Sequence, residues 1–250
     1  MLCDAHVHVG YFQDQYFSPE DVVRGLRRLG VGRWAVSSTS TSGKPWAFVR
    51  KEYERICELA DKQSVLLLWL TPEMLIQSRD LRKYDVLPFC GLKIHGANGW
   101  RVGGQPLRRA FALARERKWP VILHTGGFPE YEAGRFGPLC RTFPDVPVIL
   151  AHGRPIEQAL NVMQQSDNAW ADTAFMPLRD VQRLLASGMS RRVLFGSDYP
   201  APACFYKAPL ASYYRRRVLT LQRSCGASWP LLARRNFMAL FDRPSRKEEK

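Results

Sequence analysis

The sequence lacks any apolar run near the roughly 20 residues that a membrane-spanning helix needs. It also lacks a basic amino-terminal segment followed by an apolar stretch and a cleavage site, the pattern of a secretory signal. Its six cysteines are scattered, with no C-x-x-C pair, so neither a disulfide framework nor a zinc ribbon is indicated. We therefore expect a cytoplasmic protein with reduced thiols and no membrane contact.

Acidic residues are scarce: 23 Asp and Glu face 37 Lys and Arg, giving a formal charge of +14. A nucleic-acid binder usually concentrates basic residues on one face or tail and adds aromatic stacking residues. Here the basic residues are spread over the expected helices in short clusters, such as residues 215–217. The composition does not favour a nucleic-acid partner, although a positive field attracts anionic substrates. We expect a small-molecule substrate, and the sequence leaves a homo-oligomer open.

Strand-like and helix-like stretches alternate along the 250 residues. An apolar run such as residues 65–70 is typical of a strand buried on both faces of a parallel sheet. The expected strands are residues 2–9, 34–37, 65–70, 89–95, 120–124, 146–152, 169–173 and 192–198. Eight strands alternating with helices predict an α/β fold, a single (β/α)8 TIM barrel, for which about 250 residues are typical. We expect one barrel domain over residues 1–242 with a short closing helix at its end, then a charged tail over residues 243–250.

Histidine is also scarce, and its placement is the strongest signal in the sequence. The five histidines, together with one lysine and one aspartate, each end a predicted strand: His6, His8, His95, His124, His152, Lys93 and Asp198. The catalytic residues of such barrels lie on that face, whereas histidines that serve packing or solubility would also fall on helices. His6 and His8 are two residues apart, so both point to the same side of the first strand. The pattern predicts a metal site.

Five segments, in order, resemble the amidohydrolase superfamily. They are D-A-H-V-H-V-G, G-L-K-I-H-G, V-I-L-H-T-G-G, I-L-A-H-G and F-G-S-D-Y-P, and R-N-F-M-A-L-F near the end resembles the helix that closes those barrels. The chain is most similar to the amidohydrolase-2 branch of small metal-dependent hydrolases and decarboxylases. The resemblance implies that His6, His8, His124 and Asp198 bind a divalent ion. Zinc is the default for these ligands, and manganese or iron also suits them.

The resemblance further implies catalytic roles. A bound metal brings the pKa of water near 7 and polarises a carbonyl, and Asp198 accepts the proton of that water. The histidine that matches His152 orients water or substrate in mononuclear members and binds a second metal in binuclear ones. The lysine that matches Lys93 is carbamylated and bridges two metals in some members. In the small branch, the residues that match Lys93 and His95 instead face a substrate carboxylate, which is the interpretation we prefer for this chain.

Loops that follow the strands set substrate choice in barrels. Arg154, directly after His152 and Gly153, is the best candidate for binding an anion, and Trp100 and Arg101 are further candidates for substrate contact. The leading hypothesis is a metal-dependent hydrolase of an amide, lactone or ester bond in a small acidic or aromatic substrate. Decarboxylation of an aromatic acid, a TatD-like metal nuclease and a non-catalytic binding protein on a decayed barrel are the alternatives.

Overall fold

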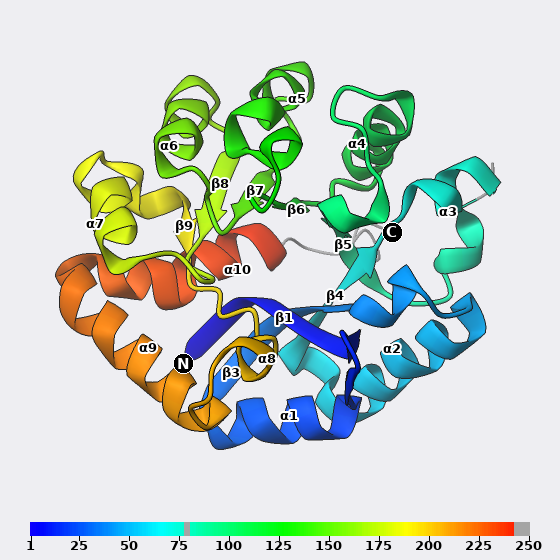
Figure 1. The fold of residues 1–250 in the computed structure, drawn as a ribbon, viewed down its shortest axis with the longest axis horizontal. Coiled ribbons are helices and arrows are strands. Elements are labelled where there is room, and N and C mark those ends of the chain that lie inside the picture. The colour runs from blue at the N-terminus through cyan, green and yellow to red at the C-terminus, as the bar shows by residue number, and fades with distance from the viewer. Residues whose placement is uncertain (78–80, 243–250) are drawn as a thin grey trace, which may run out of the picture.

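A computed structural model describes residues 1–77 and 81–242, and Figure 1 shows an α/β fold around a curled sheet. The sheet order is β2-β1-β3-β4-β5-β6-β7-β8-β9; β2 pairs antiparallel with β1, and the other pairings are parallel. The strands are β1 (Leu2–Phe12), β2 (Gln15–Phe17), β3 (Val31–Ser38), β4 (Ser64–Trp69), β5 (Phe89–Ile94), β6 (Val121–His124), β7 (Val148–Ala151), β8 (Ala169–Asp172) and β9 (Val193–Leu194). The expected α/β class with a parallel sheet is confirmed.

Helices accompany the sheet, and most of them lie on its outer side (Figure 1). They are α1 (Pro19–Arg28), α2 (Trp46–Ala60), α3 (Pro72–Gln77), α4 (Gln105–Arg117), α5 (Gly137–Thr142), α6 (Ile156–Gln165), α7 (Leu178–Ala186), α8 (Pro202–Phe205), α9 (Leu210–Cys225) and α10 (Asn236–Phe241). Helix α1 begins as its sequence predicts, since the Ser18 side chain accepts a hydrogen bond from the backbone N–H of Asp21 and Pro19 fills the first turn. No helix among the described residues is long and apolar enough to cross a membrane.

The two ends of the parallel sheet are joined by backbone contacts. The N–H of Ala5 donates to the carbonyl of Phe195 at 2.9 Å, and the N–H of His8 donates to that of Tyr199 at 2.7 Å. Both bonds link β1 to the extended segment that follows β9. The sequence predicts a strand over residues 192–198, but only Val193 and Leu194 form regular strand. The rest of that segment leaves the ladder and carries Asp198.

Apolar side chains form two layers, one inside the curled sheet and one between the sheet and its helices. Alternation along β4 shows the division, because Val65 and Leu67 belong to the inner cluster and Leu66 and Leu68 to the outer one. The inner cluster also contains side chains from α10, namely Phe237, Leu240 and Phe241. Helix α10 therefore packs against the starts of the strands and leaves their carboxyl ends to polar residues.

Strand β1 changes face within its own length. Cys3 and Ala5 belong to the inner cluster, whereas Val7 and Val9 belong to the outer one, although all four are odd-numbered. The pairing of β1 with β3 shifts register between Asp4 and Val7. Such an irregularity re-aims the side chains that follow it. Hydrophobic residues thus fill the inner face at the start of β1, and histidines occupy it at the end.

Two further features differ from what local sequence patterns suggest. The segment after β6 is rich in Gly and Pro, which usually indicate a loop, but it contains two 3-10 turns and helix α5. The closing helix expected at the end of the barrel domain is preceded by a π-helical turn, Leu231–Arg235, and becomes α-helical at Asn236. The side-chain amide of Asn236 donates to the carbonyls of Ser190 and Val193, so it ties α10 to β9. The predicted tail, residues 243–250, lies outside the described residues.

Candidate metal and catalytic site

The carboxyl ends of the strands surround a cavity of about 790 Å³. All five histidines line it, with Lys93, Arg154 and Asp198 and with an aromatic group at its rim: Phe12, Phe128, Phe175, Phe205 and Tyr206. These side chains come from the ends of strands along the whole chain and from the segments that follow them, so the parallel sheet brings them together. The fold thus places the predicted polar residues at one common site.

His6, His8 and Asp198 converge on one another. Nε2 of His8 lies 2.9 Å from Oδ1 of Asp198, and Nε2 of His6 lies 3.5 Å from the same oxygen. One ligand atom from each of the three residues lies within 4.8 Å of the others, and all three side chains are buried. Strand β1 and the segment that follows β9 therefore contribute to one cluster of nitrogen and oxygen donors.

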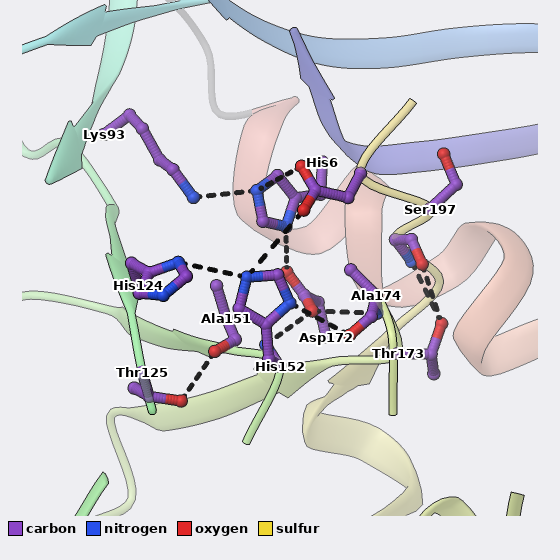
Figure 2. A network of polar contacts seen from close by, with 12 residues as sticks. His6, Lys93, His124, Thr125, Ala151, His152, Asp172, Thr173, Ala174 and Ser197 are labelled. Carbon is purple, nitrogen blue, oxygen red and sulfur yellow. Dashed lines mark hydrogen bonds and ion pairs between the residues drawn. The ribbon is translucent and has the colours of Figure 1, made fainter. Parts of the chain in front are cut away.

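The other ring nitrogen of each histidine is already engaged. Nδ1 of His6 lies 2.8 Å from Oδ2 of Asp172, and Nδ1 of His8 lies 3.0 Å from Oγ of Ser37. A carboxylate fixes a histidine with its proton on the bonded nitrogen, as the outer partners of metal-binding histidines do. On this assignment His6 Nε2 carries the lone pair, and both Lys93 Nζ, at 2.7 Å, and Asp198 Oδ1, at 3.5 Å, lie near it. Figure 2 shows the Asp172 contact beneath the ring.

These residues fit a divalent metal. Four donors about 2.1 Å from a tetrahedral metal lie about 3.4 Å from one another, close to the 2.9 and 3.5 Å found here. Two imidazoles and one carboxylate are also the donors that zinc prefers in catalytic sites. His124 is not in the group of donors within 4.8 Å, so its part as a further ligand stays a prediction.

Asp198 and His152 both have left-handed backbone conformations, with φ of 59° and 69°. Residues other than glycine seldom adopt such angles, which recur at functional sites. The backbone N–H of His152 is held by Oδ1 of Asp172 at 3.0 Å, and its Nδ1 faces the carbonyl of Ala174 at 3.0 Å. Local hydrogen bonds therefore sustain the turn that carries His152 into the cavity.

His152 also pairs with His124. Nε2 of His152 lies 3.2 Å from Nδ1 of His124, and the His124 ring lies 4.0 Å, centroid to centroid, from that of His95. The His95 ring stacks in turn on Trp69 at 5.4 Å. A row of rings from β6 and from the ends of β5 and β7 therefore lines the cavity beside the cluster of His6, His8 and Asp198.

Lys93 is almost completely buried, with 1% of its side chain exposed, and its Nζ lies 2.7 Å from Nε2 of His6. Burial lowers the pKa of the Lys93 ammonium to about 8, against the opposing attraction of Asp198 and Asp172. The prediction that Lys93 faces the site agrees with this position (Figure 2). Its amine could bind a substrate anion or take part in a carbamate.

Burial also lowers the pKa values of histidines in the site. It lowers the pKa of His8 to about 4 and that of His152 to about 4, although Asp198 opposes both shifts. Burial alone would raise the pKa of the Asp198 carboxyl, but the His6, His8 and His152 rings together hold it well below its usual range. Near neutral pH His8 and His152 are therefore neutral imidazoles and Asp198 is an ionised carboxylate, the protonation states in which such groups bind metals.

Arg154 lines the cavity, and its side chain donates to the carbonyl of Phe175 at 3.1 Å. Trp100 and Arg101, expected to contact substrate, do not line it. The Trp100 side chain is 3% exposed within the apolar core, and its carbonyl accepts from the Tyr131 hydroxyl at 2.6 Å. This bond holds the loop after β5 against the loop after β6. Trp100 and Arg101 instead line a different cavity. The structure corrects the sequence expectation here.

Two supporting residues escaped the sequence analysis. Ser37, the last but one residue of β3, bonds His8. The buried Asp4 accepts from the N–H of His6 and from the N–H and hydroxyl of Ser197. Asp4 thereby connects His6 on β1 with Ser197, the residue before Asp198, where the two ends of the sheet meet. Its place two residues before the first histidine was the available signal, but its partners are about 190 residues away in sequence.

The Amidohydrolase family model matches residues 3–206. The chain therefore belongs to the amidohydrolase-2 family, as its motifs predict. A search of curated protein sequences found no match.

Solved structures share the fold at low identity. One is described as a probable 2-pyrone-4,6-dicarboxylic acid hydrolase from Acinetobacter baumannii, with 13% identity, TM-score 0.69, and coverage of 97% of this chain and 99% of the other. A Tim-barrel protein from Bordetella bronchiseptica has 15% identity, TM-score 0.69, and coverage of 96% and 98%. A Burkholderia multivorans amidohydrolase with bound zinc has 12% identity, TM-score 0.68, and coverage of 98% and 100%.

Proposed function

We propose that this protein is a metal-dependent hydrolase on a closed (β/α)8 barrel, acting on an amide, lactone or ester bond of a small acidic or aromatic substrate. The observation that carries the proposal is the convergence of His6 Nε2 and His8 Nε2 on Asp198 Oδ1, with both Nδ1 atoms already engaged. Zinc is the metal we favour, because of the donor set and because one neighbour of this fold contains it.

His6, His8 and Asp198 would hold the metal, with His124 as a further ligand. A divalent ion in such a site acidifies water and polarises a carbonyl oxygen. The residues of the chain then position the substrate and move the proton. In hydrolysis the water oxygen bonds to the carbonyl carbon, the bond to the nitrogen or oxygen leaving group breaks, and one proton goes to that group.

Asp198 is the residue we assign to that proton. Its Oδ1 faces the two histidines, while Oδ2 lies 3.9 Å from Nε2 of His152. Since Asp198 stays ionised, it can accept the proton of the attacking water and return it to the leaving group. His152 would orient water or substrate from the other side of the carboxylate.

The substrate side of the cavity is aromatic and cationic. Phe175 contacts both Phe205 and Tyr206, with ring centroids 5.7 and 6.1 Å apart, and the three rings line the cavity. Arg154 and Lys93 add positive charge, and His95 adds a neutral ring nitrogen. An apolar or planar body carrying a carboxylate is complementary to this lining.

The test is a screen of lactones, amides, esters and aromatic acids on protein purified without chelator. We expect turnover with cleavage into two products or ring opening, lost in Asp198→Asn and retained in Asp167→Asn, a matched change at an exposed site. Release of carbon dioxide from an aromatic acid would show that the reaction is decarboxylation and not hydrolysis. Cleavage of a labelled oligonucleotide, abolished by His6→Ala, would identify a nuclease instead. No turnover together with no bound metal would favour a binding protein.

A further inference from the structure

A second cavity, of about 860 Å³, lies beside the loop that follows β5 and the turns that precede α5. Its lining includes Trp100, Arg101, Arg108, Tyr131, Arg135 and Leu139. None of these six residues lines the cavity that holds the histidines. The second cavity is therefore separate from the proposed catalytic site.

The lining of this cavity carries an excess of positive charge. Three arginines, Arg101, Arg108 and Arg135, face a single acidic side chain, that of Glu130. Among the described residues, no carboxylate lies within ion-pair distance of any of the three arginines; Arg108 makes only a 3.5 Å hydrogen bond to the carbonyl of Gly103. By contrast, Arg117 on the neighbouring helix α4 pairs with Asp85 at 2.7 Å. The three guanidinium groups are thus free to bind an anion.

Aromatic and apolar groups form the rest of the cavity. Trp100 is buried, and its indole Nε1 has no hydrogen-bond partner, which is uncommon for a buried donor. Tyr131 and Leu139 are also buried, so they present fixed apolar surface. Tyr131 is held at both ends, because its hydroxyl bonds the Trp100 carbonyl and its ring packs on the backbone of Gly96.

We propose that this cavity is a binding site for a small organic anion that carries two or more acidic groups on a planar or apolar body. Guanidinium groups match carboxylate and phosphate oxygens in a two-pronged geometry, and Trp100, Tyr131 and Leu139 supply the surface for the body. The net charge of +14 raises the local concentration of such anions. The inference rests on this cavity alone and does not depend on the reaction proposed above.

Isothermal titration calorimetry with trimesate (benzenetricarboxylate) and, separately, with inorganic phosphate tests the proposal. All variants carry Arg154→Gln, because that change removes a cation of the other cavity where an anion could also bind. Into this background we place the double substitution Arg101→Gln, Arg135→Gln and, as a matched control, Arg141→Gln. Arg141 is exposed on α5 and bonds Gln165, but it does not line the cavity.

We expect saturable binding of trimesate that the double substitution weakens by at least about tenfold, while Arg141→Gln changes it by less than about twofold. Binding of trimesate alone identifies a polycarboxylate ligand, and binding of phosphate as well identifies an anion site that also takes phosphate compounds. The proposal is overturned if neither anion binds saturably, if the double substitution has no effect, or if Arg141→Gln weakens binding equally. Circular dichroism and thermal midpoints check that each variant is folded.

Discussion

The Nδ1 atom of His6 lies 2.8 Å from Oδ2 of Asp172, and both side chains are buried beneath the cavity. The other carboxylate oxygen of Asp172 accepts from the backbone N–H groups of His152 and Ala174, each at 3.0 Å. One aspartate at the end of β8 thus orients a ring on β1 and the turn that follows β7. Figure 2 shows that this carboxylate lies at the centre of the polar network.

The first prediction concerns this aspartate. Asp172→Asn keeps the shape of the side chain but removes the charge that fixes the His6 ring. We expect the affinity for zinc to fall by about 10- to 100-fold, the usual effect of losing such an outer partner. Competition with a chelating dye measures the affinity, and Asp167→Asn serves as the exposed control. Unchanged affinity in Asp172→Asn would show that the carboxylate does not orient a metal ligand.

Ser37→Ala removes the hydroxyl that holds Nδ1 of His8. A neutral hydrogen bond contributes about 1 kcal/mol, so the metal affinity should fall by about fivefold, less than in Asp172→Asn. The same chelator competition measures it. If Ser37→Ala weakened binding more than Asp172→Asn, the hydroxyl would be the more important of the two partners, contrary to our account.

Acid should destabilise the metal-free protein. Burial lowers the folded-state pKa of His8 and His152 to about 4 and that of His95 to about 3, whereas an unfolded histidine titrates near 6.5. The unfolded chain therefore binds more protons between these values. The stabilisation is complete above about pH 6.5 and is lost as the pH falls through about 4, by up to about 1.4 kcal/mol per pH unit for each histidine.

Two carboxyls oppose this trend. Burial raises the pKa of the Asp4 carboxyl to about 6 from 3.8, although its hydrogen bonds lower it, so its contribution decreases as the pH rises between those values. Burial also raises the pKa of the Glu52 carboxyl, against its hydrogen bonds to Ser38 and Ser40. The three histidines outweigh these two carboxyls, and we expect the free energy of unfolding in urea to be lower at about pH 5 than at about pH 6.5. His152→Asn should flatten this dependence. An unfolding free energy that is independent of pH over this range would contradict the burial argument.

The carboxy-terminal helix should be essential for stability. Phe237 is 1% exposed in the inner cluster, so Phe237→Ala should lower the free energy of unfolding by about 3–5 kcal/mol. Phe48→Ala, at a side chain that is 37% exposed, should cost much less. Urea denaturation measures both. Equal losses would mean that α10 does not complete the inner core.

The alternating pattern was sufficient to predict most of the fold. The α/β class and the alternation of strands with helices follow from local patterns in the sequence, and the family assignment is confirmed. Helix α5 was missed because its segment contains Gly137 and Pro138, which are read from sequence as loop residues. The shortened β9 was missed because its apolar run continues beyond the point where the ladder ends.

The residues that form the site were predictable from the sequence, but the hydrogen bonds between them were not. The five histidines and Asp198 ended strands, so a common face was expected, and all of them line one cavity. The Asp172–His6 contact joins residues 166 positions apart, and no local pattern encodes such a pair. Trp100 was misplaced because its sequence shows a loop residue but not that Tyr131 draws that loop into the core.

The most direct test of the central claim is the number of metal ions per chain, measured by elemental analysis and native mass spectrometry on protein purified without chelator. We expect about one divalent ion per chain, lost when His6 and His8 are both changed to Ala. The exposed control Asp167→Asn should keep it. Two ions per chain, with a mass increment on Lys93, would contradict the single-metal account and favour a carbamate bridge. No bound metal in the native chain would contradict the account altogether.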